Sequence, residues 1–392
     1  MELREEYRER QRRFQELLGQ NGIDGALIVQ SADLVYLTGT YQDMHLYLPA
    51  EGEPLLMVRR DLEVAQTDAC VEKIVPLQRF SEIPGLMLDH SLALPARLGL
   101  ELDVLPAAYY LKYQSVFKNA ELVDCSSLLR RLRAVKTPWE ISILRAGGKA
   151  LDALFEALPG LLELGRTELE LAGRLEALAR ARGHQGYVRV RGFNAEVFWG
   201  HLLSGANAAH SSYFDGVIGG AGSGPWMRFG AGSKRIASGE IILVDYPGVW
   251  QGYTVDMTRI FAFGAPDRRL IAAHALALEI QESLADKMRP GVKAGDLYDV
   301  AWEMAGRAGR AHNFMGLRAP VSFIGHGVGI ELNEWPVLAR GSESRLETGN
   351  VIAIEPKFVF EGLGTVGIEN TFLVTEDGAE RLTRYPDDMH IL

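Results

Sequence analysis

Hydrophobic positions in the first part of the chain follow two different periods, which together predict an α/β domain. Residues 2–22 place apolar side chains near helical spacing and predict one amphipathic helix. Short apolar runs at 24–29, 34–38 and 54–58 are typical of buried strands. Strand-like runs alternate with helical segments up to about residue 125, and no catalytic cluster is evident among them.

A helix start marks the boundary to a second domain. Thr137-Pro-Trp-Glu140 has the form of a capping box with proline at the first helical position. The preceding residues 128–135 are interpreted as a linking helix or linker. We therefore expect an α/β fold of two domains, residues 1–130 and residues 131–392, with α+β character in the second.

The second domain contains a weak internal repeat. A long helix predicted over 138–158 precedes a shorter one over 165–183, and helices over 266–288 and 291–309 repeat that order. Each pair is followed by an apolar run and then by a hairpin pattern that carries carboxylates. A duplicated half-domain of this kind predicts a pseudo-two-fold structure in which the two hairpins meet.

Carboxylates end two glycine-led apolar runs, Gly239-Glu-Ile-Ile-Leu-Val-Asp245 and Gly349-Asn-Val-Ile-Ala-Ile-Glu355. Each run is followed by a strand-like stretch with a further acid, Asp256 after the first and Glu369 after the second. A hairpin would bring the two acids of each half together. Between the two pairs of acids lies His326, in Gly325-His-Gly-Val-Gly329.

This set of four acids and one histidine predicts a pair of metal ions. Carboxylates at buried strand ends are costly unless they are paired, and neighbouring carboxylates repel unless a cation neutralises them. Any one of these acids fits an ordinary ion-pair network, but the whole set in this order favours metal binding. Oxygen ligands with a single histidine suit Mn²⁺, Co²⁺, Fe²⁺ or Zn²⁺.

Composition narrows the class of protein. The formal net charge of -10 argues against non-specific nucleic-acid binding. Cys70 and Cys125 are the only cysteines, which excludes a disulfide framework and C-x-x-C motifs. The charged start of the chain does not resemble a signal peptide, and no apolar run approaches the roughly 20 residues of a membrane span. We expect a cytoplasmic protein.

The motifs around these residues resemble the M24 metallopeptidases, which include Xaa-Pro aminopeptidases, prolidases and methionine aminopeptidases, with creatinase on the same fold. The resemblance rests on Gly252-Tyr-x-x-Asp256-x-Thr-Arg259, Gly-His326-Gly-x-Gly, Glu334-x-Pro336, Ile-Glu355-Pro and Ile-Glu369. Tyr36-Leu-Thr-Gly39 is similar to the creatinase/prolidase N-terminal domain. The resemblance implies a pita-bread second domain, a dinuclear site and a homodimer.

The resemblance also implies roles for the ligands. Asp245 would chelate one metal, Asp256 and Glu369 would bridge both, and His326 and Glu355 would hold the other. Mn²⁺ or Co²⁺ is expected ahead of Zn²⁺ or Fe²⁺. A bridging hydroxide would attack the amide carbon of an Xaa-Pro aminopeptidase or Xaa-Pro dipeptidase substrate, with Glu355 as proton shuttle as well as ligand.

Several positions depart from the pattern of proline-directed members. The histidines usual four residues before and seven after the ligand histidine are replaced by Ser322 and Asn333, and the arginine usual two residues before the bridging glutamate is replaced by Gly367. An earlier histidine is expected near Arg228 by direct counting, and His210 is the substitute. Asn333 can still donate a hydrogen bond but cannot act as an acid at neutral pH.

These departures leave other readings open. A small-molecule enzyme on the same scaffold, such as a creatinase-like or ectoine-like hydrolase or a lyase, is the alternative to a peptidase. A binding protein is disfavoured, because it would have no need of the full ligand set. His210, Arg228, Tyr253 and Trp335 are candidates for the missing roles. The glycine-rich segment 214–232 is interpreted as a long loop, either a lid or a packed surface excursion.

Overall fold

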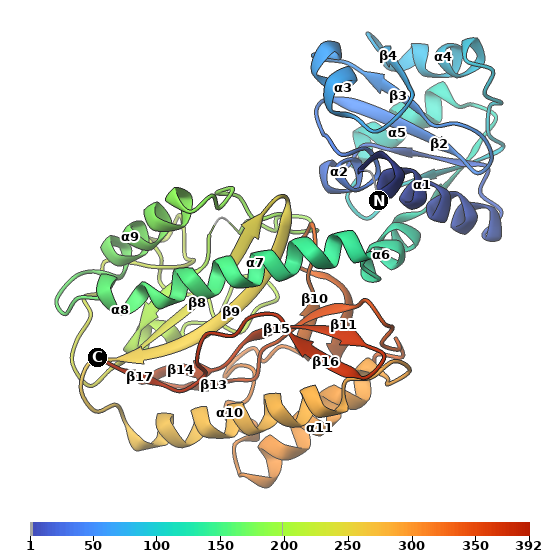
Figure 1. Ribbon diagram of the computed structural model, residues 1–392. Helices are drawn as coiled ribbons and strands as arrows, with labels where there is room; N and C mark the ends of the chain where they lie inside the picture. The colour runs from blue at the N-terminus through green and yellow to red at the C-terminus, as the bar shows by residue number, and fades with distance from the viewer. Residues whose placement is uncertain (1–2, 198) are drawn as a thin grey trace. The chain divides into compact units, whose positions relative to one another are not determined.

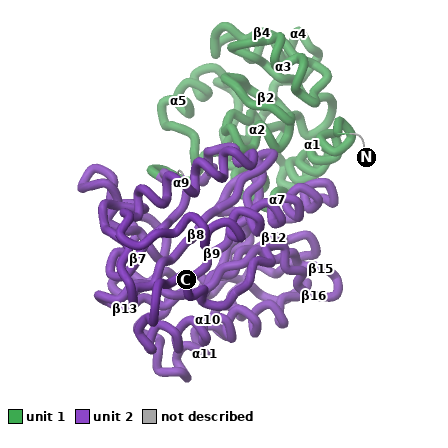
Figure 2. The backbone as a smooth tube through the Cα atoms, turned by 60° about the vertical axis from the view of Figure 1, so that its left-hand side comes forward, with its two compact units in different colours: residues 1–133, 192–194 green, residues 134–191, 195–392 purple. Residues whose placement is uncertain are grey.

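The computed structural model describes residues 3–197 and 199–392, and the chain divides into two compact units (Figure 2). The first unit runs to Arg133 and includes residues 192–194, and the second comprises residues 134–191 and 195–392. The boundary expected at 130/131 would cut a helix that runs from Ser126 to Ala134. No sequence pattern predicted that residues 192–194 belong with the first unit.

The first unit is built on a six-stranded sheet with the order β4-β3-β2-β1-β5-β6. Strands β1, β2 and β3 pair antiparallel, and the outer pairs β3–β4, β1–β5 and β5–β6 are parallel. The strands are β1 (Gly25–Ile28), β2 (Met44–Pro49), β3 (Leu55–Val58), β4 (Lys73–Pro76), β5 (Arg97–Leu100) and β6 (Glu121–Asp124). The helices are α1 (Leu3–Gln20), α2 (Ser31–Thr38), η1 (Phe80–Glu82, 3₁₀), α3 (Leu62–Asp68), α4 (Ile83–Asp89), α5 (Ala107–Val116) and α6 (Ser126–Ala134).

One predicted strand of this unit is wrong. Residues 34–38 lie in helix α2, whose start is capped by Gln30, where the side chain accepts a hydrogen bond from the backbone N–H of Asp33. The helix ends at Gly39, which has a left-handed φ of 86°. A short apolar run cannot by its period distinguish a buried strand from a buried helical turn, and here the two caps decide it.

The second unit repeats a helix pair followed by strands. Helices α7 (Pro138–Glu156), α8 (Leu158–Leu161) and α9 (Glu168–Ala181) precede β7 (His201–Ser204), η2 (Gly205–Ala209, 3₁₀), β8 (Ile241–Trp250) and β9 (Tyr253–Ala262). Helices α10 (Arg268–Lys287), α11 (Ala294–Arg307) and η3 (Ala311–Asn313, 3₁₀) precede β10 (Phe323–Gly327), β11 (Glu334–Ala339), β12 (Val351–Ile354), β13 (Lys357–Phe360), β14 (Gly364–Gly367), β15 (Asn370–Thr375), β16 (Gly378–Arg381) and β17 (His390–Ile391).

The predicted start of α7 is confirmed. Thr137 Oγ1 accepts from the Glu140 backbone N–H at 3.3 Å, and Glu140 Oε2 accepts from the Thr137 N–H at 2.9 Å, so the capping box is complete. Thr167 and Glu170 form a second capping box at the start of α9. Figure 1 shows α7 lying along β8 and β9, and α10 lying along β13 and β14.

The strands of the second unit form a sheet with the order β17-β9-β8-β7, a sheet with the order β11-β10-β12-β15-β16, and the hairpin β13–β14. The two larger sheets meet where Thr258 of β9 bridges to Glu369, the residue before β15, with backbone N···O distances of 3.3 and 3.4 Å. The predicted meeting of the two halves is confirmed at this point. Buried aliphatic and aromatic side chains from both halves form the core behind it.

Candidate metal centre

The register of the β8–β9 hairpin places two of the predicted ligands on one face. Asp245 lies opposite Thr258, and Asp256 lies opposite Pro247. Residues two apart on a strand share a face, so Asp245 and Asp256 are diagonal neighbours on the same surface. The hydroxyl of Thr258, on that same face, donates to Glu369 Oε2 at 2.8 Å.

The second half supplies the other three residues from neighbouring chain segments. His326 lies in β10 opposite Ala353 of β12. Glu355 directly follows β12, and its backbone N–H donates to Ile324 O at 2.9 Å. Glu369 directly precedes β15. All three residues therefore lie in a strand or next to one, where backbone hydrogen bonds fix the position of the chain.

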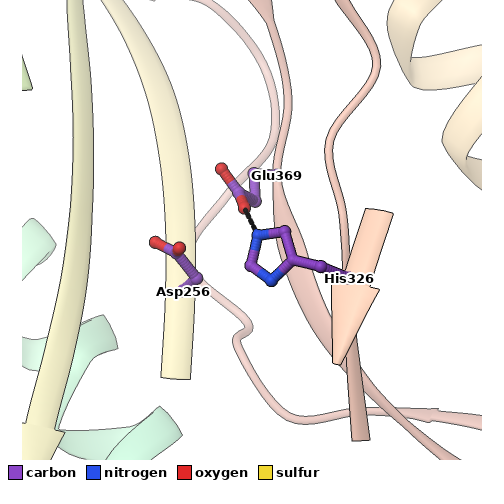
Figure 3. A group of neighbouring side chains, drawn as sticks. All are labelled: Asp256, His326 and Glu369. Atoms are coloured by element: carbon purple, nitrogen blue, oxygen red, sulfur yellow. Dashed lines mark ion pairs between the residues drawn. The ribbon is translucent and has the colours of Figure 1, made fainter. Parts of the chain in front are cut away.

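Three of the five residues form a group that could hold one metal ion. Asp256, His326 and Glu369 each offer a ligand atom, and these atoms lie within 4.8 Å of one another. Figure 3 shows the three side chains coming from separate segments, with the imidazole ring directed at the Glu369 carboxylate. His326 Nδ1 lies 3.1 Å from Gly327 O. A proton on Nδ1 would donate there and leave Nε2 as the lone-pair nitrogen for a metal.

A lysine that the motif comparison did not single out lies inside the acidic cluster. Lys357 Nζ is 2.6 Å from Glu355 Oε2, 2.9 Å from Glu369 Oε2 and 3.1 Å from Asp245 Oδ2. The lysine side chain is 2% exposed. An ammonium carries three N–H donors, and three carboxylates surround this one.

Burial and mutual repulsion shape the protonation of the acids. Burial raises the pKa of Glu369 to about 8, with Lys357 opposing the rise and Glu355 and Asp245 adding to it. Burial and then Glu369 raise the pKa of Asp256 well above its usual range. Burial alone would lower the pKa of Lys357, but the surrounding carboxylates outweigh it and raise that pKa well above its usual value. The carboxylates of Asp245, Asp256, Glu355 and Glu369 therefore carry more negative charge, when ionised, than the single Lys357 ammonium neutralises.

The donor set therefore fits one metal ion, which three of the five predicted ligands would hold. Asp256, His326 and one oxygen of Glu369 are oriented for a divalent cation, and such a cation would meet the charge shortage. Asp245 and Glu355, which a second ion would need, are within ion-pair distance of the Lys357 ammonium. These residues do not fit a second ion while Lys357 stays in this position.

Asn333, predicted as an auxiliary catalytic residue, has both ends of its side-chain amide engaged. Its Oδ1 accepts from the Arg191 backbone N–H, and its Nδ2 donates to Arg191 O, each at 2.9 Å. The neighbouring Leu332 N–H donates to Arg189 O at 2.8 Å. Asn333 thus joins residues 189–191 to the loop before β11, and the second N–H of its Nδ2 takes no part in these two bonds.

His210, the other predicted auxiliary residue, lies just after the 3₁₀ turn η2. Its Nδ1 is 3.1 Å from Asn207 Oδ1. Asn207 donates in turn to the buried carboxylate of Glu168, which also accepts from the Ser204 N–H at 2.6 Å. This network orients the histidine from one side.

Segment 214–232 forms no helix or regular strand, as predicted, and its aromatic residues differ in burial. Phe229 is 4% exposed and stands edge-on to His201, with ring centroids 4.4 Å apart, whereas Trp226 is 80% exposed. Arg228 is exposed in this loop, and Ser322 is exposed just before β10. Part of the loop is therefore a packed excursion.

The remaining two candidates lie near other structural contacts. Tyr253 is buried, and its hydroxyl donates to Glu140 Oε1 at 3.0 Å at the start of α7. Trp335 is half-buried and precedes Pro336 through a cis peptide bond. The contacts of both residues are therefore those of structural residues that pack within the fold.

Sequence reasoning missed two residues of this region. Lys357 follows Glu355 by two positions, and a basic residue so close to a predicted ligand was the signal that the sequence offered. His201 lies opposite Asp245 in the β7–β8 ladder, and burial lowers the pKa of its imidazole to about 4. Its link to Asp245 depends on the strand register, which the sequence does not display.

The fold and this ligand set together define a class of enzyme. Residues 142–376 match the metallopeptidase family M24, and residues 10–135 match the creatinase/prolidase N-terminal domain. The chain belongs to the M24 metallopeptidase family and is a hydrolase of that class, as the resemblance predicted. Among the described residues, no helix is both long and apolar enough to cross a membrane.

Similar proteins span almost the whole chain. An Xaa-Pro dipeptidase from Pyrococcus furiosus is 26% identical over 380 residues, which cover 96% of this chain and 98% of that protein. The structure of an Xaa-Pro dipeptidase from Bacillus anthracis has a TM-score of 0.84 at 25% identity and covers 98% of this chain and 100% of that one. Dipeptidase PepE from Mycobacterium ulcerans has a TM-score of 0.82 at 26% identity and covers 99% of this chain and 98% of that one.

Proposed function

We propose that this protein hydrolyses the C–N bond of a small peptide in a metal-dependent reaction, with Xaa-Pro dipeptides as the substrate class to test first. The observation that carries the proposal is the group Asp256, His326 and Glu369 on a fold shared along its length with dipeptidases. The similar proteins named Xaa-Pro dipeptidase support the choice of substrate.

A bound divalent ion would polarise the scissile carbonyl and lower the pKa of a coordinated water. The chain's own residues would do the rest. Glu355 Oε1 lies 3.5 Å from His326 Nε2, at the edge of the metal-ligating group, and it is the proposed acceptor of the attacking water's proton. His210 and Asn333 are the proposed auxiliary groups, and Asn333 would donate to the substrate through the second N–H of its amide while it keeps both bonds to Arg191.

Mn²⁺ and Co²⁺ are the ions to test first, followed by Zn²⁺ and Fe²⁺, since all accept oxygen and imidazole ligands. The set of five ligands with two ions is the arrangement implied by the family. It requires Asp245 and Glu355 to exchange their ion pairs with Lys357 for metal bonds.

We also propose a homodimer in the cytoplasm. The dimer follows from the family resemblance, and light scattering on the purified protein tests it. Cys70 and Cys125 are the only cysteines in the sequence, and this low cysteine content supports a reducing compartment.

The test is a substrate panel on metal-stripped protein reloaded with Mn²⁺ or Co²⁺. The panel contains Xaa-Pro dipeptides, longer Xaa-Pro peptides, and small guanidino or cyclic amidine compounds. Cleavage of a peptide that Glu369→Gln abolishes supports the proposal. Glu361→Gln, which removes an exposed carboxylate paired with Arg318, is the matched control and should retain activity. Turnover of small compounds alone would establish a small-molecule enzyme instead.

A further inference from the structure

We infer that the Lys357 ammonium holds the place of the second metal ion, so that this centre binds one divalent ion per chain. The inference rests on the proposed metal dependence but not on the identity of the substrate. It follows from how the two glutamates divide their oxygen atoms, from how the lysine is fixed in the sheet, and from the charge of the cluster.

Both glutamates direct one oxygen at the ammonium and the other toward the imidazole. Glu355 Oε2 lies 2.6 Å from Lys357 Nζ, while its Oε1 lies 3.5 Å from His326 Nε2. Glu369 Oε2 lies 2.9 Å from the same ammonium, while its Oε1 lies 3.9 Å from His326 Nε2. Carboxylates that divide their oxygens in this way bridge two centres of positive charge. One of those centres is the ammonium, and the other is the position faced by the imidazole.

The lysine is held by backbone and by close packing. Lys357 O accepts from the Met315 N–H at 2.9 Å, and Lys357 pairs with Gly367 across the β13–β14 hairpin. A Cβ at position 367 would lie 2.7 Å from Lys357 Cγ and 2.4 Å from Pro356 O. Glycine at 367, where the family pattern has arginine, leaves the space that the lysine stem fills.

Charge supports the same assignment. Asp245, Asp256, Glu355 and Glu369 carry four negative charges when ionised. The ammonium and one divalent ion supply three positive charges, which leaves the centre with one negative charge. A second divalent ion would lie close to the buried ammonium, and these ligands include no further acid that could neutralise it. Repulsion between the ion and the ammonium would therefore oppose binding of the ion.

Metal stoichiometry tests the inference without reference to catalysis. Metal-stripped protein is titrated with Mn²⁺ by calorimetry, and bound metal is counted by elemental analysis after desalting. The wild type should bind one ion per chain. Lys357→Ala frees three carboxylates and should raise the count to two, and Lys357→Met, which removes the charge but keeps most of the stem, should raise it less or not at all.

Lys293→Ala is the matched control, because Lys293 is half-buried and forms an ion pair with the exposed Glu343 in the same unit, and its metal count should equal that of the wild type. Two ions bound by the wild type, or none, would overturn the inference whether or not the variants fold. A folded Lys357→Ala protein that still binds a single ion would overturn it as well. Stoichiometry of one with no peptide cleavage would leave this inference standing and reject the proposed substrate class.

Discussion

The ammonium of Lys357 lies 2.6 Å from the carboxylate of Glu355, two positions earlier in the chain. Glu355 and Pro356 form the short connection between β12 and β13, and Lys357 is the first residue of β13. The same ammonium reaches Asp245 and Glu369, so one lysine connects both halves of the second unit. The predicted ligands therefore divide into a group around the ammonium and the metal-ligating group, and Glu369 belongs to both.

Replacing Asp256 by alanine should remove the bound ion. Asp256 belongs to the metal-ligating group and is 4% exposed, so the alanine variant loses one of the three ligand atoms of that group. The loss of affinity should exceed the about 10–100-fold that removal of an outer hydrogen-bond partner causes. Elemental analysis after desalting measures it. Asp299→Ala, on the exposed side of α11, is the control, and equal metal content in both variants would refute the assignment.

Gly367→Ala should destabilise the second unit by about 1–3 kcal/mol, because an added Cβ would press on Lys357 Cγ and Pro356 O. Thermal unfolding provides the measurement. Gly173→Ala is the control, since no atom lies within 4 Å of a Cβ there in helix α9, and it should stabilise by about 0.4–1 kcal/mol. Equal melting temperatures for the two variants would show that position 367 tolerates a side chain.

Asn333→Ala distinguishes a structural from a catalytic role. Loss of both bonds to the Arg191 backbone should cost about 1–3 kcal/mol and speed hydrogen exchange in residues 189–191. A catalytic donor would instead show a fall in kcat of about 10²–10³, with exchange unchanged. Thr375→Ala, which removes a half-buried hydroxyl that donates to Gly378 O at the end of β15, is a control for the loss of a hydrogen bond elsewhere in the unit. We expect hydrogen exchange in residues 189–191 to be faster in Asn333→Ala than in the wild type, whether or not kcat also falls.

Acid should weaken the first unit through His45. Burial lowers the pKa of this imidazole to about 4 from 6.5, and its Nε2 lies 2.8 Å from the Tyr113 hydroxyl. The unfolded chain therefore binds a proton at a pH where the folded unit does not. The histidine's contribution is complete above pH 6.5 and is lost as the pH falls from 6.5 to 4.

The loss can reach about 3 kcal/mol at about 1.4 kcal/mol per pKa unit. Urea unfolding of the wild type and of His45→Gln, followed by hydrogen exchange in β2, measures it. The variant should lose less stability between pH 7 and pH 4.5 than the wild type does. Parallel pH curves would show that His45 does not carry this dependence.

Local patterns along the chain were enough to predict several features. The capping box at Thr137 and Glu140, the alternation around Asp256 and the glycine-led runs before Asp245 and Glu355 each depend on neighbours a few residues apart. These features can be predicted from a sequence because capping and strand alternation depend only on residues that are close together along the chain. The two halves and the acids of the candidate centre were predicted from these patterns, whereas the family was predicted from the resemblance of the motifs around Asp256, His326 and Glu369.

Other features depend on contacts between distant segments, and only the tertiary structure decided them. Residues 34–38 became a helix through caps at Gln30 and Gly39, not through their own period. His201 faces Asp245 because of strand register, and Asn333 is engaged by the backbone of Arg191. Lys357 was visible in the sequence, but its meaning required three carboxylates from three chain segments to converge on one nitrogen. Electrostatic neutralisation depends on distance in space, and spacing along the chain does not encode it.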